Sequence, residues 1–156
     1  MKNSKCTTVG KVFTIAAALT LALGIASTAY ADDKGCSSAS LRGTFGYTST
    51  GSIAAPPEIA GPFVEVGTQT FDGSGATTGS ATLSQNGNIL SITVTGTYTV
   101  NADCTGTFTL QVSPIDVTVH VSFVIDDNLS EFQAIETDAG LVITRIGRRL
   151  FPGRAI

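Results

Sequence analysis

Three polar side chains in the second half of the chain carry groups that act as acids or bases. His120 is the single histidine, so its imidazole is expected to titrate near neutral pH. Tyr98 carries a phenol, and Glu136 carries a carboxylate whose pKa would rise if it faced a buried interior. Solvated positions on a strand surface or at a strand end are expected for His120, Glu136 and Glu65, and an inward position in a polar lumen is the alternative. The nucleophile elbow and the phosphate-binding loop are both absent, so the sequence leaves open whether the chain is an enzyme.

Cys36 and Cys104 are predicted to form a disulfide bond with each other. An isolated cysteine pair in an exported chain is most simply a disulfide, and closing a loop of about 69 residues would stabilise the fold by roughly 4 kcal/mol. Two cysteines and one histidine are too few ligands for a zinc site. Asp126, Asp127 and Asn128 offer oxygen atoms without the spacing of a calcium loop, and a hairpin turn is expected there. We therefore expect no metal and no cofactor.

The first 31 residues have the pattern of a secretory signal peptide. Three lysines precede an apolar run at residues 12–26, and small residues lead to a predicted cleavage point after Ala31. The run of about 15 apolar residues is shorter than the 18 or more of a membrane-spanning helix; an uncleaved anchor is the alternative. The chain would then comprise a signal peptide, 1–31, and a single domain, 32–156, without a transmembrane segment. The predicted location is secreted or periplasmic.

The charge of the predicted domain argues against nucleic acid as a partner. Three of the nine basic residues lie in the signal peptide and all twelve acidic residues follow it, which leaves six basic residues and a net charge of −6. Binding to nucleic-acid phosphates requires a surface rich in lysine and arginine. One basic patch, Arg145, Arg148, Arg149 and Arg154, is expected to face water and pair with acidic groups. Contact with an anionic envelope surface is the alternative for this patch.

Apolar residues after Ala31 recur at every second position, which is the period of a half-buried β-strand. Short turn sequences such as Asn86-Gly87 separate these segments. Eight strands are predicted, at residues 41–50, 63–72, 76–84, 89–100, 106–113, 116–125, 130–137 and 141–149, with a proline-containing loop at 51–62. Consecutive strands with tight turns favour an all-β, eight-stranded antiparallel up-and-down barrel, because closure removes exposed edges. A two-sheet β-sandwich is the alternative.

A Gly-Thr-aromatic phrase recurs at 43–45, 96–98 and 106–108, with a longer version at 67–71. Glycine inside a strand usually marks a bulge or a sharp bend, and barrels need such bends at their corners. The aromatic residue two positions later lies on the same face of the strand, so its ring is expected to cover the glycine backbone. A sugar-binding aromatic platform is the alternative interpretation, and the sequence has no tryptophan to support it.

Five segments stand out together: LRGTFGYT (41–48), FDGSG (71–75), GTYTVNADCTGT (96–107), FVIDD (123–127) and FQAIETDAG (132–140). They resemble a group of small secreted, mostly uncharacterised bacterial proteins with a Gly-Thr-Tyr-x-Val-Asn-x-Asp-Cys-Thr-Gly signature. The resemblance implies a calycin-like barrel similar to those of allene oxide cyclase and the dirigent proteins, which bind apolar small molecules and steer cyclisation or coupling without a cofactor. No catalytic motif of those enzymes matches here, so the resemblance implies a fold and carries no active site.

Three functions are consistent with such a barrel. The first is a monomeric or weakly oligomeric binding protein that holds a small apolar ligand in its lumen. The residues predicted to line this lumen are Val94, Tyr98, Phe108 and Val119. The second is a cofactor-free cyclase or isomerase that uses Tyr98, His120 or Glu136 in the same cavity. The third is a structural envelope protein whose barrel is filled by its own side chains.

Overall fold

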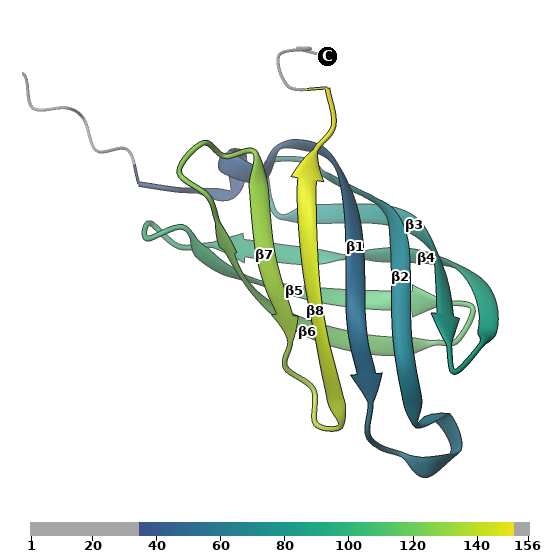
Figure 1. The fold of residues 1–156 in the computed structure, drawn as a ribbon. Coiled ribbons are helices and arrows are strands. Elements are labelled where there is room, and N and C mark those ends of the chain that lie inside the picture. The colour runs from purple at the N-terminus through teal and green to yellow at the C-terminus, as the bar shows by residue number, and fades with distance from the viewer. Residues whose placement is uncertain (1–34, 152–156) are drawn as a thin grey trace, which may run out of the picture. The chain divides into compact units, whose positions relative to one another are not determined.

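The structure, a computed structural model, describes residues 35–151 and shows them as a closed β-barrel (Figure 1). Eight strands follow one another around the ring in chain order, each antiparallel to its neighbours, and the last pairs with the first. The strands are β1 (Gly43–Ile53), β2 (Gly61–Phe71), β3 (Ala76–Gln85), β4 (Asn88–Val100), β5 (Thr105–Ser113), β6 (Val117–Ile125), β7 (Glu131–Glu136) and β8 (Leu141–Arg149). β7, with six residues, is the shortest. Two short 3₁₀ helices, η1 (Ser38–Leu41) and η2 (Pro57–Ile59), precede β1 and β2.

The predicted eight-stranded up-and-down barrel is confirmed. A β-sandwich is ruled out because β8 pairs with β1 and closes the ring. The proline-containing loop was predicted too long: β1 continues to Ile53 and β2 begins at Gly61, so Pro62 lies inside a strand. Proline is tolerated there because it is the second residue of the strand. Its carbonyl still accepts a hydrogen bond from the Asn86 N–H at 2.8 Å.

Two predictions fall outside the residues that the structure describes. They are the signal peptide, 1–31, and the position of Arg154 in the basic patch. Within residues 35–151, no helix is long and apolar enough to cross a membrane.

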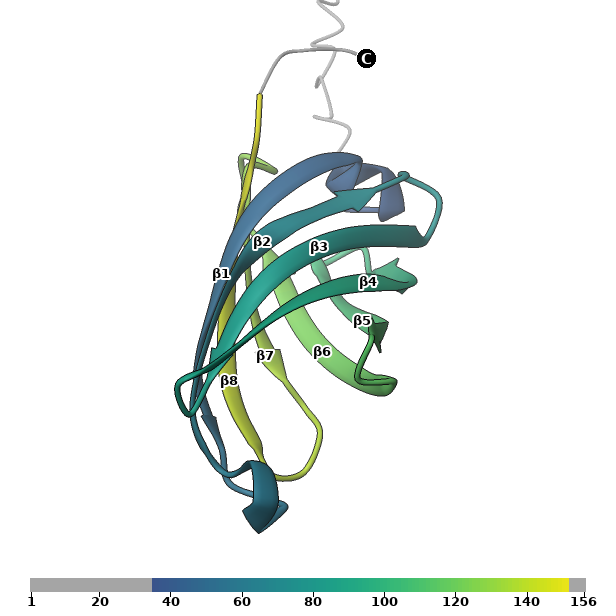
Figure 2. The ribbon, with the colours of Figure 1, turned by 90° about the vertical axis from the view of Figure 1, so that its right-hand side faces the viewer.

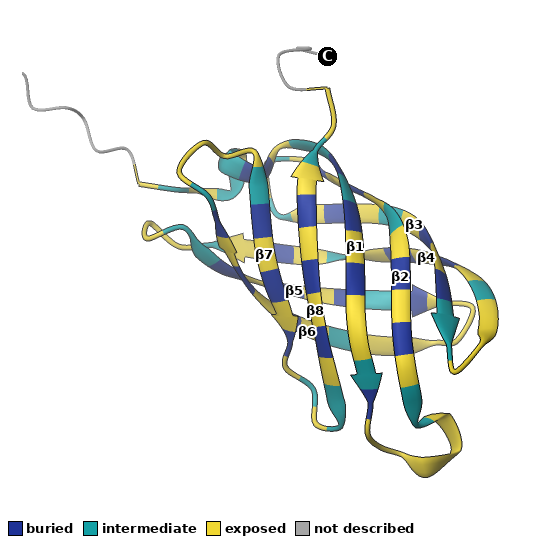
Figure 3. Ribbon diagram, viewed as in Figure 1, coloured by how far each residue is buried: buried dark blue, intermediate teal, exposed yellow. Residues whose placement is uncertain are grey.

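Side chains alternate between the inside and the outside of the barrel, as the bands of buried and exposed residues in Figure 3 show. The inward side chains form two groups. The aromatic half, at the end where β1 begins, contains Phe45, Phe71, Tyr98, Phe108, Phe123 and Phe132. The aliphatic half, at the end where β1 finishes, contains Ile53, Phe63, Leu83, Ile92, Val94, Val112 and Ile143. In the aromatic half the rings pack on one another, with the centroids of Phe108 and Phe123 only 4.3 Å apart.

A lid closes the aromatic half. It consists of residues 36–42, which include η1, and its Leu41 side chain is fully buried in the aromatic cluster. Figure 2 shows η1 at the end of the barrel where β1 starts. Tyr98 holds the lid, because its hydroxyl donates to the Ser38 carbonyl at 3.0 Å and accepts from the Gly73 N–H at 2.9 Å.

The lid is also held by a covalent bond and by an arginine. The predicted disulfide bond between Cys36 and Cys104 is confirmed, and the Cys36 N–H donates to the Ala102 carbonyl at 3.1 Å. Nη2 of Arg149 donates to the Ser40 carbonyl at 2.8 Å. The disulfide therefore ties the turn between β4 and β5 to the segment that precedes β1.

Glycines in the strands let aromatic rings approach the barrel wall. A Cβ on Gly106 would lie 2.3 Å from Cζ of Phe123, and one on Gly147 would lie 2.3 Å from the ring of Phe132. Each ring comes from the neighbouring strand, whereas the Gly-Thr-aromatic phrase predicts a ring from the same strand. The ring from the neighbouring strand is the closer one, because paired residues lie about 5 Å apart across a ladder. Alternate residues of one strand lie about 7 Å apart.

The outer face of the wall is built largely from threonine, valine and isoleucine. Its exposed apolar residues include Val64, Val66, Ile89, Val124, Ile135, Val142 and Ile146. Many of the carboxylates lie in turns, where they accept hydrogen bonds from backbone N–H groups. Asp126 accepts from the N–H groups of Ser130 and Glu131 at 2.7 and 2.9 Å. The segment at 126–128 therefore forms the hairpin turn that the sequence predicts.

Candidate functional site

A group of polar side chains lies inside the barrel between the aromatic and the aliphatic halves. On β1 they fall between Phe45 and Ile53, and on β2 between Phe63 and Phe71. We call this group the polar layer; its members are Tyr47, Ser49, Glu65, Gln69, Glu136 and Arg145. All six are buried, and they come from four strands, so only the closed ring brings them together.

Arg145 on β8 is at the centre of the polar layer. Its Nε donates to Ser49 Oγ at 3.0 Å, its Nη1 to Gln69 Oε1 at 3.4 Å and its Nη2 to Glu65 Oε2 at 3.4 Å. Its Cζ also lies 4.4 Å from the centroid of the Tyr47 ring, which is a cation–π distance. The guanidinium is therefore held by side chains from two strands, β1 and β2.

The prediction that Arg145 faces water is wrong, because the residue is 4% exposed. The alternation of β8 places it inward together with Ile143 and Gly147. Buried carboxylates within reach offset the unfavourable desolvation of the guanidinium. Arg148, one of its neighbours in the predicted basic patch, does face water and pairs with Glu131 at 2.7 Å.

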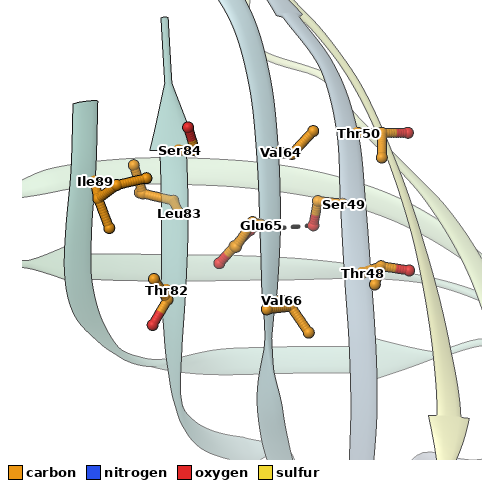
Figure 4. Close-up of a pocket in the computed structure, with 10 residues that line it drawn as sticks. All are labelled: Thr48, Ser49, Thr50, Val64, Glu65, Val66, Thr82, Leu83, Ser84 and Ile89. Atoms are coloured by element: carbon orange, nitrogen blue, oxygen red, sulfur yellow. Dashed lines mark hydrogen bonds between the residues drawn. The ribbon is translucent and has the colours of Figure 1, made fainter. Parts of the chain in front are cut away.

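Glu65 is the carboxylate that Arg145 and β1 hold most firmly. Tyr47 donates its hydroxyl proton to Glu65 Oε1 at 2.6 Å, and Ser49 Oγ donates to Oε2 at 3.1 Å, the contact drawn in Figure 4. Burial raises the pKa of Tyr47, and the nearby Glu65 carboxylate raises it further against the opposing effect of Arg145. A solvated position for Glu65, expected from the sequence, is therefore wrong.

Glu136, at the end of β7, is the carboxylate with the fewest partners. It is 8% exposed, and its Oε1 lies 3.6 Å from Nη2 of Arg145. It accepts no hydrogen bond from any residue in 35–151. Every fully buried side-chain oxygen in this range does have a hydrogen-bond partner, so the oxygens of Glu136 are not fully buried. Solvent therefore reaches its oxygens. Burial raises the pKa of Glu136 to about 7, Arg145 partly opposes the shift, and the Glu65 charge adds to it.

The three predicted acid or base residues lie in different places. Tyr98 lies in the aromatic half, and its hydroxyl bonds to the lid. His120 is on the outer face of β6, where its Nδ1 lies 2.8 Å from Asp138 Oδ1. Of the three, Glu136 alone belongs to the polar layer, so the structure does not bring them together. The solvated position that the sequence favours for Glu136 is wrong, because the residue lies on the inward face of β7 and is buried.

The four predicted lumen residues are likewise divided. Tyr98 and Phe108 belong to the aromatic half, where neighbouring rings and the lid cover them. Val94 belongs to the aliphatic half, and the half-buried Val119 packs against both groups. Val94 and Val119 are therefore the two predicted lumen residues that lie in or against the aliphatic half.

Tyr47, Ser49 and Gln69 are members of the polar layer that the sequence analysis did not single out as functional residues. A signal for two of them was present, because Tyr47 and Ser49 follow Phe45 at the period of two that defines an inward face. Their partners Glu65 and Arg145 are distant in sequence, and only the register of the ring shows that they meet.

Two open hollows lie on the outside of the wall. One, of about 360 Å³, extends across β1 to β4 and has Val64, Val66 and Ile89 among its lining residues (Figure 4). The other, of about 520 Å³, extends across β5 to β7 and includes Val124 and Ile135. Glu65, a member of the polar layer, is the one charged residue that lines either hollow, and the other lining residues of both are uncharged.

Comparison with known proteins supports the architecture of the chain. No protein-family model matches the sequence, and no curated protein matches it. A solved structure titled "Structure of a redesigned beta barrel, b11L5F_LGL" is similar, with a TM-score of 0.53 and 17% identity. The similarity covers 72% of this chain and 94% of that chain. At this identity it shows the fold alone: the described part of the chain is a small closed β-barrel.

Proposed function

We infer that the chain is an exported binding protein that holds a small apolar molecule in the aliphatic half of its barrel. The observation that carries this proposal is Glu136, a buried carboxylate without a hydrogen bond that solvent still reaches. A barrel that served stability alone would gain from an apolar side chain at this position, because buried ion pairs are often no more stabilising than apolar residues. A recessed polar group beside apolar walls is typical of a ligand site.

The exposure of the inward side chains supports the aliphatic half as the site. Phe63 and Val112 there are 9% and 7% exposed, whereas Phe108 and Phe132 in the aromatic half are both 0% exposed. Inward residues of the aliphatic half are on the whole more exposed than those of the aromatic half, although Phe123 and Ala134 of the aromatic half are also 5% and 9% exposed. The lid covers the aromatic half, so a ligand would enter at the opposite end.

Export is part of the proposal, and the disulfide bond supports it because such bonds persist in oxidising compartments. The intact mass of the protein recovered from the medium or periplasm should correspond to a chain that begins at Asp32 and has two oxidised cysteines. Recovery of the full-length chain from the cytosol alone would contradict export.

The binding proposal is tested with a neutral apolar dye and a matched pair of variants. Val119→Phe narrows the lumen and should weaken dye binding at least about tenfold, since a buried ring takes the place of the ligand. Val124→Phe, on the outer face of the same strand, should leave binding unchanged. Leu90→Phe, also half-buried against the aliphatic half, is the second lumen variant should Val119→Phe fail to fold.

Native mass spectrometry of protein purified from its own host provides the second readout. We expect a retained small molecule in the wild-type chain and less of it in the lumen variant. The proposal is rejected if repeated preparations carry no ligand and the folded wild-type protein binds no apolar dye.

A second candidate function, cofactor-free isomerisation of the bound molecule, is favoured by one observation. Glu136 has a pKa of about 7 and can therefore both accept and donate a proton near neutral pH. Incubation with an apolar ketone in D₂O should then produce deuterium exchange next to the carbonyl, and Glu136→Gln should abolish it. Exchange at the same rate in both proteins would exclude Glu136 as the base.

A further inference from the structure

We propose that the molecule held in the aliphatic half carries a cationic amine, and that this amine binds the carboxylate of Glu136. The inference rests on the proposed binding function and specifies its ligand class. It follows from the balance of charges inside the barrel, from the position of Glu136 and from the donors already used by Arg145.

The polar layer has one more carboxylate than it has cations. Its charged members are Glu65, Glu136 and Arg145. Arg145 donates a hydrogen bond to Glu65 at 3.4 Å, and Glu65 also accepts hydrogen bonds from the hydroxyl groups of Tyr47 and Ser49. Glu65 is thus fully partnered by hydrogen bonds, and it shares the single guanidinium charge with Glu136, at 3.4 and 3.6 Å from Nη2 of Arg145. Glu136 remains as the surplus negative group.

No other cation of the described barrel is placed to neutralise Glu136. Arg149, the other arginine on the inward side of β8, donates to carbonyls of the lid at Ser40 and of Leu129. Arg148 lies on the outer face and pairs with Glu131. The three donor nitrogens of Arg145 already contact Ser49, Gln69 and Glu65. No residue in 35–151 donates a hydrogen bond to Glu136, and Nη2 of Arg145, its ion-pair partner, lies 3.6 Å from Oε1, so a ligand amine in the aliphatic half would supply the missing donor.

An alkyl ammonium group fits this site better than an alcohol or an acid. Its N–H donors would make charge-assisted hydrogen bonds to Glu136, which are about twice as strong as neutral ones. Its hydrocarbon part would lie along the valine and isoleucine side chains of the aliphatic half. An alkyl carboxylate would place a third negative group beside a single guanidinium, which like-charge repulsion disfavours.

The test compares octylamine, octan-1-ol and octanoate, which share one chain and differ in the head group. Displacement of a neutral apolar dye at pH 7 gives the three affinities. We expect octylamine to bind at least about tenfold more tightly than octan-1-ol, and octanoate to bind most weakly. Glu136→Gln should lower the affinity for octylamine to the affinity for octan-1-ol. Glu131→Gln, at the half-buried, outward-facing start of the same strand, should retain the preference.

Calorimetry on the wild-type protein adds a readout that needs no variant. Because Glu136 is about half protonated at pH 7, amine binding should release about half a proton, seen as a dependence of the binding heat on the ionisation heat of the buffer. The inference is overturned if octylamine and octan-1-ol bind equally, if the preference survives in Glu136→Gln, or if no proton is released. Failure of all three compounds and of the dye to bind would instead reject the binding function itself.

Discussion

Arg145 is the cation shared by two buried carboxylates, and this makes it the residue on which the polar layer depends. Without it, Glu65 and Glu136 would face each other inside the barrel with no opposite charge. Removing one partner of a buried ion pair leaves an uncompensated charge, which is far more costly than losing an exposed pair. β8 allows a direct comparison, because Arg145 belongs to the buried ion pairs and Arg148, three residues later, belongs to an exposed one.

Arg145→Met should lower the free energy of unfolding by about 3–5 kcal/mol at pH 7. Arg148→Met removes only an exposed pair with Glu131 and should change the stability by about 1 kcal/mol or less. Urea denaturation followed by circular dichroism measures both. Equal effects of the two substitutions would show that the interior carboxylates do not need Arg145.

Glu136 should make the stability of the barrel depend on pH. Its pKa rises from 4.5 to about 7 on folding, because burial disfavours the charged form. The unfolded chain therefore releases this proton at a lower pH than the folded chain, and the stability falls as the pH rises through the interval from 4.5 to 7. The loss amounts to about 3 kcal/mol, since one pKa unit corresponds to about 1.4 kcal/mol.

Glu136→Gln should accordingly be more stable than the wild type at pH 8 and of similar stability at pH 5. The measurement is a series of urea denaturation curves across this range. Glu131→Gln, from the same strand, serves as the control and should follow the wild-type pH dependence. A constant difference between wild type and Glu136→Gln at all pH values would contradict the raised pKa.

Sequence patterning could not place the charged members of the polar layer correctly. Glu65 is flanked by Val64 and Val66, so alternation alone favours an inward valine pair and an outward carboxylate; the structure has the reverse. Arg145 lies in a strand with apolar residues on both faces, so alternation does not decide its direction. Both residues point inward because they meet each other across the ring, and that pairing is not a local property of either strand.

The strands themselves are the elements that the sequence predicts best, because their period of two and the turns between them are local signals. All eight were located to within a few residues. The glycines inside them have a role that local patterning cannot supply, since the ring that lies over each comes from the adjacent strand. Gly147, opposite Phe132, is the clearest case.

Gly147→Ala should destabilise the barrel by about 1–3 kcal/mol, the usual range for overpacking a core. The added methyl group would lie 2.3 Å from the Phe132 ring, which is itself held by Phe45 and Phe108 at centroid distances of 5.5 and 5.6 Å. Gly46→Ala is the matched control, because its methyl group would meet only the end of the Leu150 side chain at 3.2 Å. Thermal denaturation measures both; equal stabilities would refute the close packing.

The whole molecule is a ring that is closed by strand pairing and capped by a lid. The disulfide bond joins the lid to the turn between β4 and β5, across a sequence separation of 68 residues. Four of the eight strands, β1 to β4, lie inside this covalent loop. The cross-link therefore restricts the unfolded chain far more than it restricts the lid alone.

Replacement of both Cys36 and Cys104 by serine should lower the free energy of unfolding by roughly 4 kcal/mol, the value that loop closure predicts for this span. The expected signature in urea is a lower midpoint with a steeper slope, because the denatured chain without the cross-link is less compact and exposes more surface. Titration of the denatured, unreduced wild-type domain should detect no reactive thiol. A loss of less than about 1 kcal/mol would show that the lid is held mainly by Tyr98 and Arg149.

The short length of β7 has a consequence for how this chain behaves in concentrated solution. Segments rich in threonine, valine and isoleucine with few charges are prone to assemble into fibrils once their backbone donors and acceptors are unpaired. β7 contributes only six residues to the ring, and its detachment would leave the backbone groups of β6 and β8 that pair with it exposed and unpaired. A substitution that loosens β7 would thus convert a self-contained molecule into a template for polymer growth.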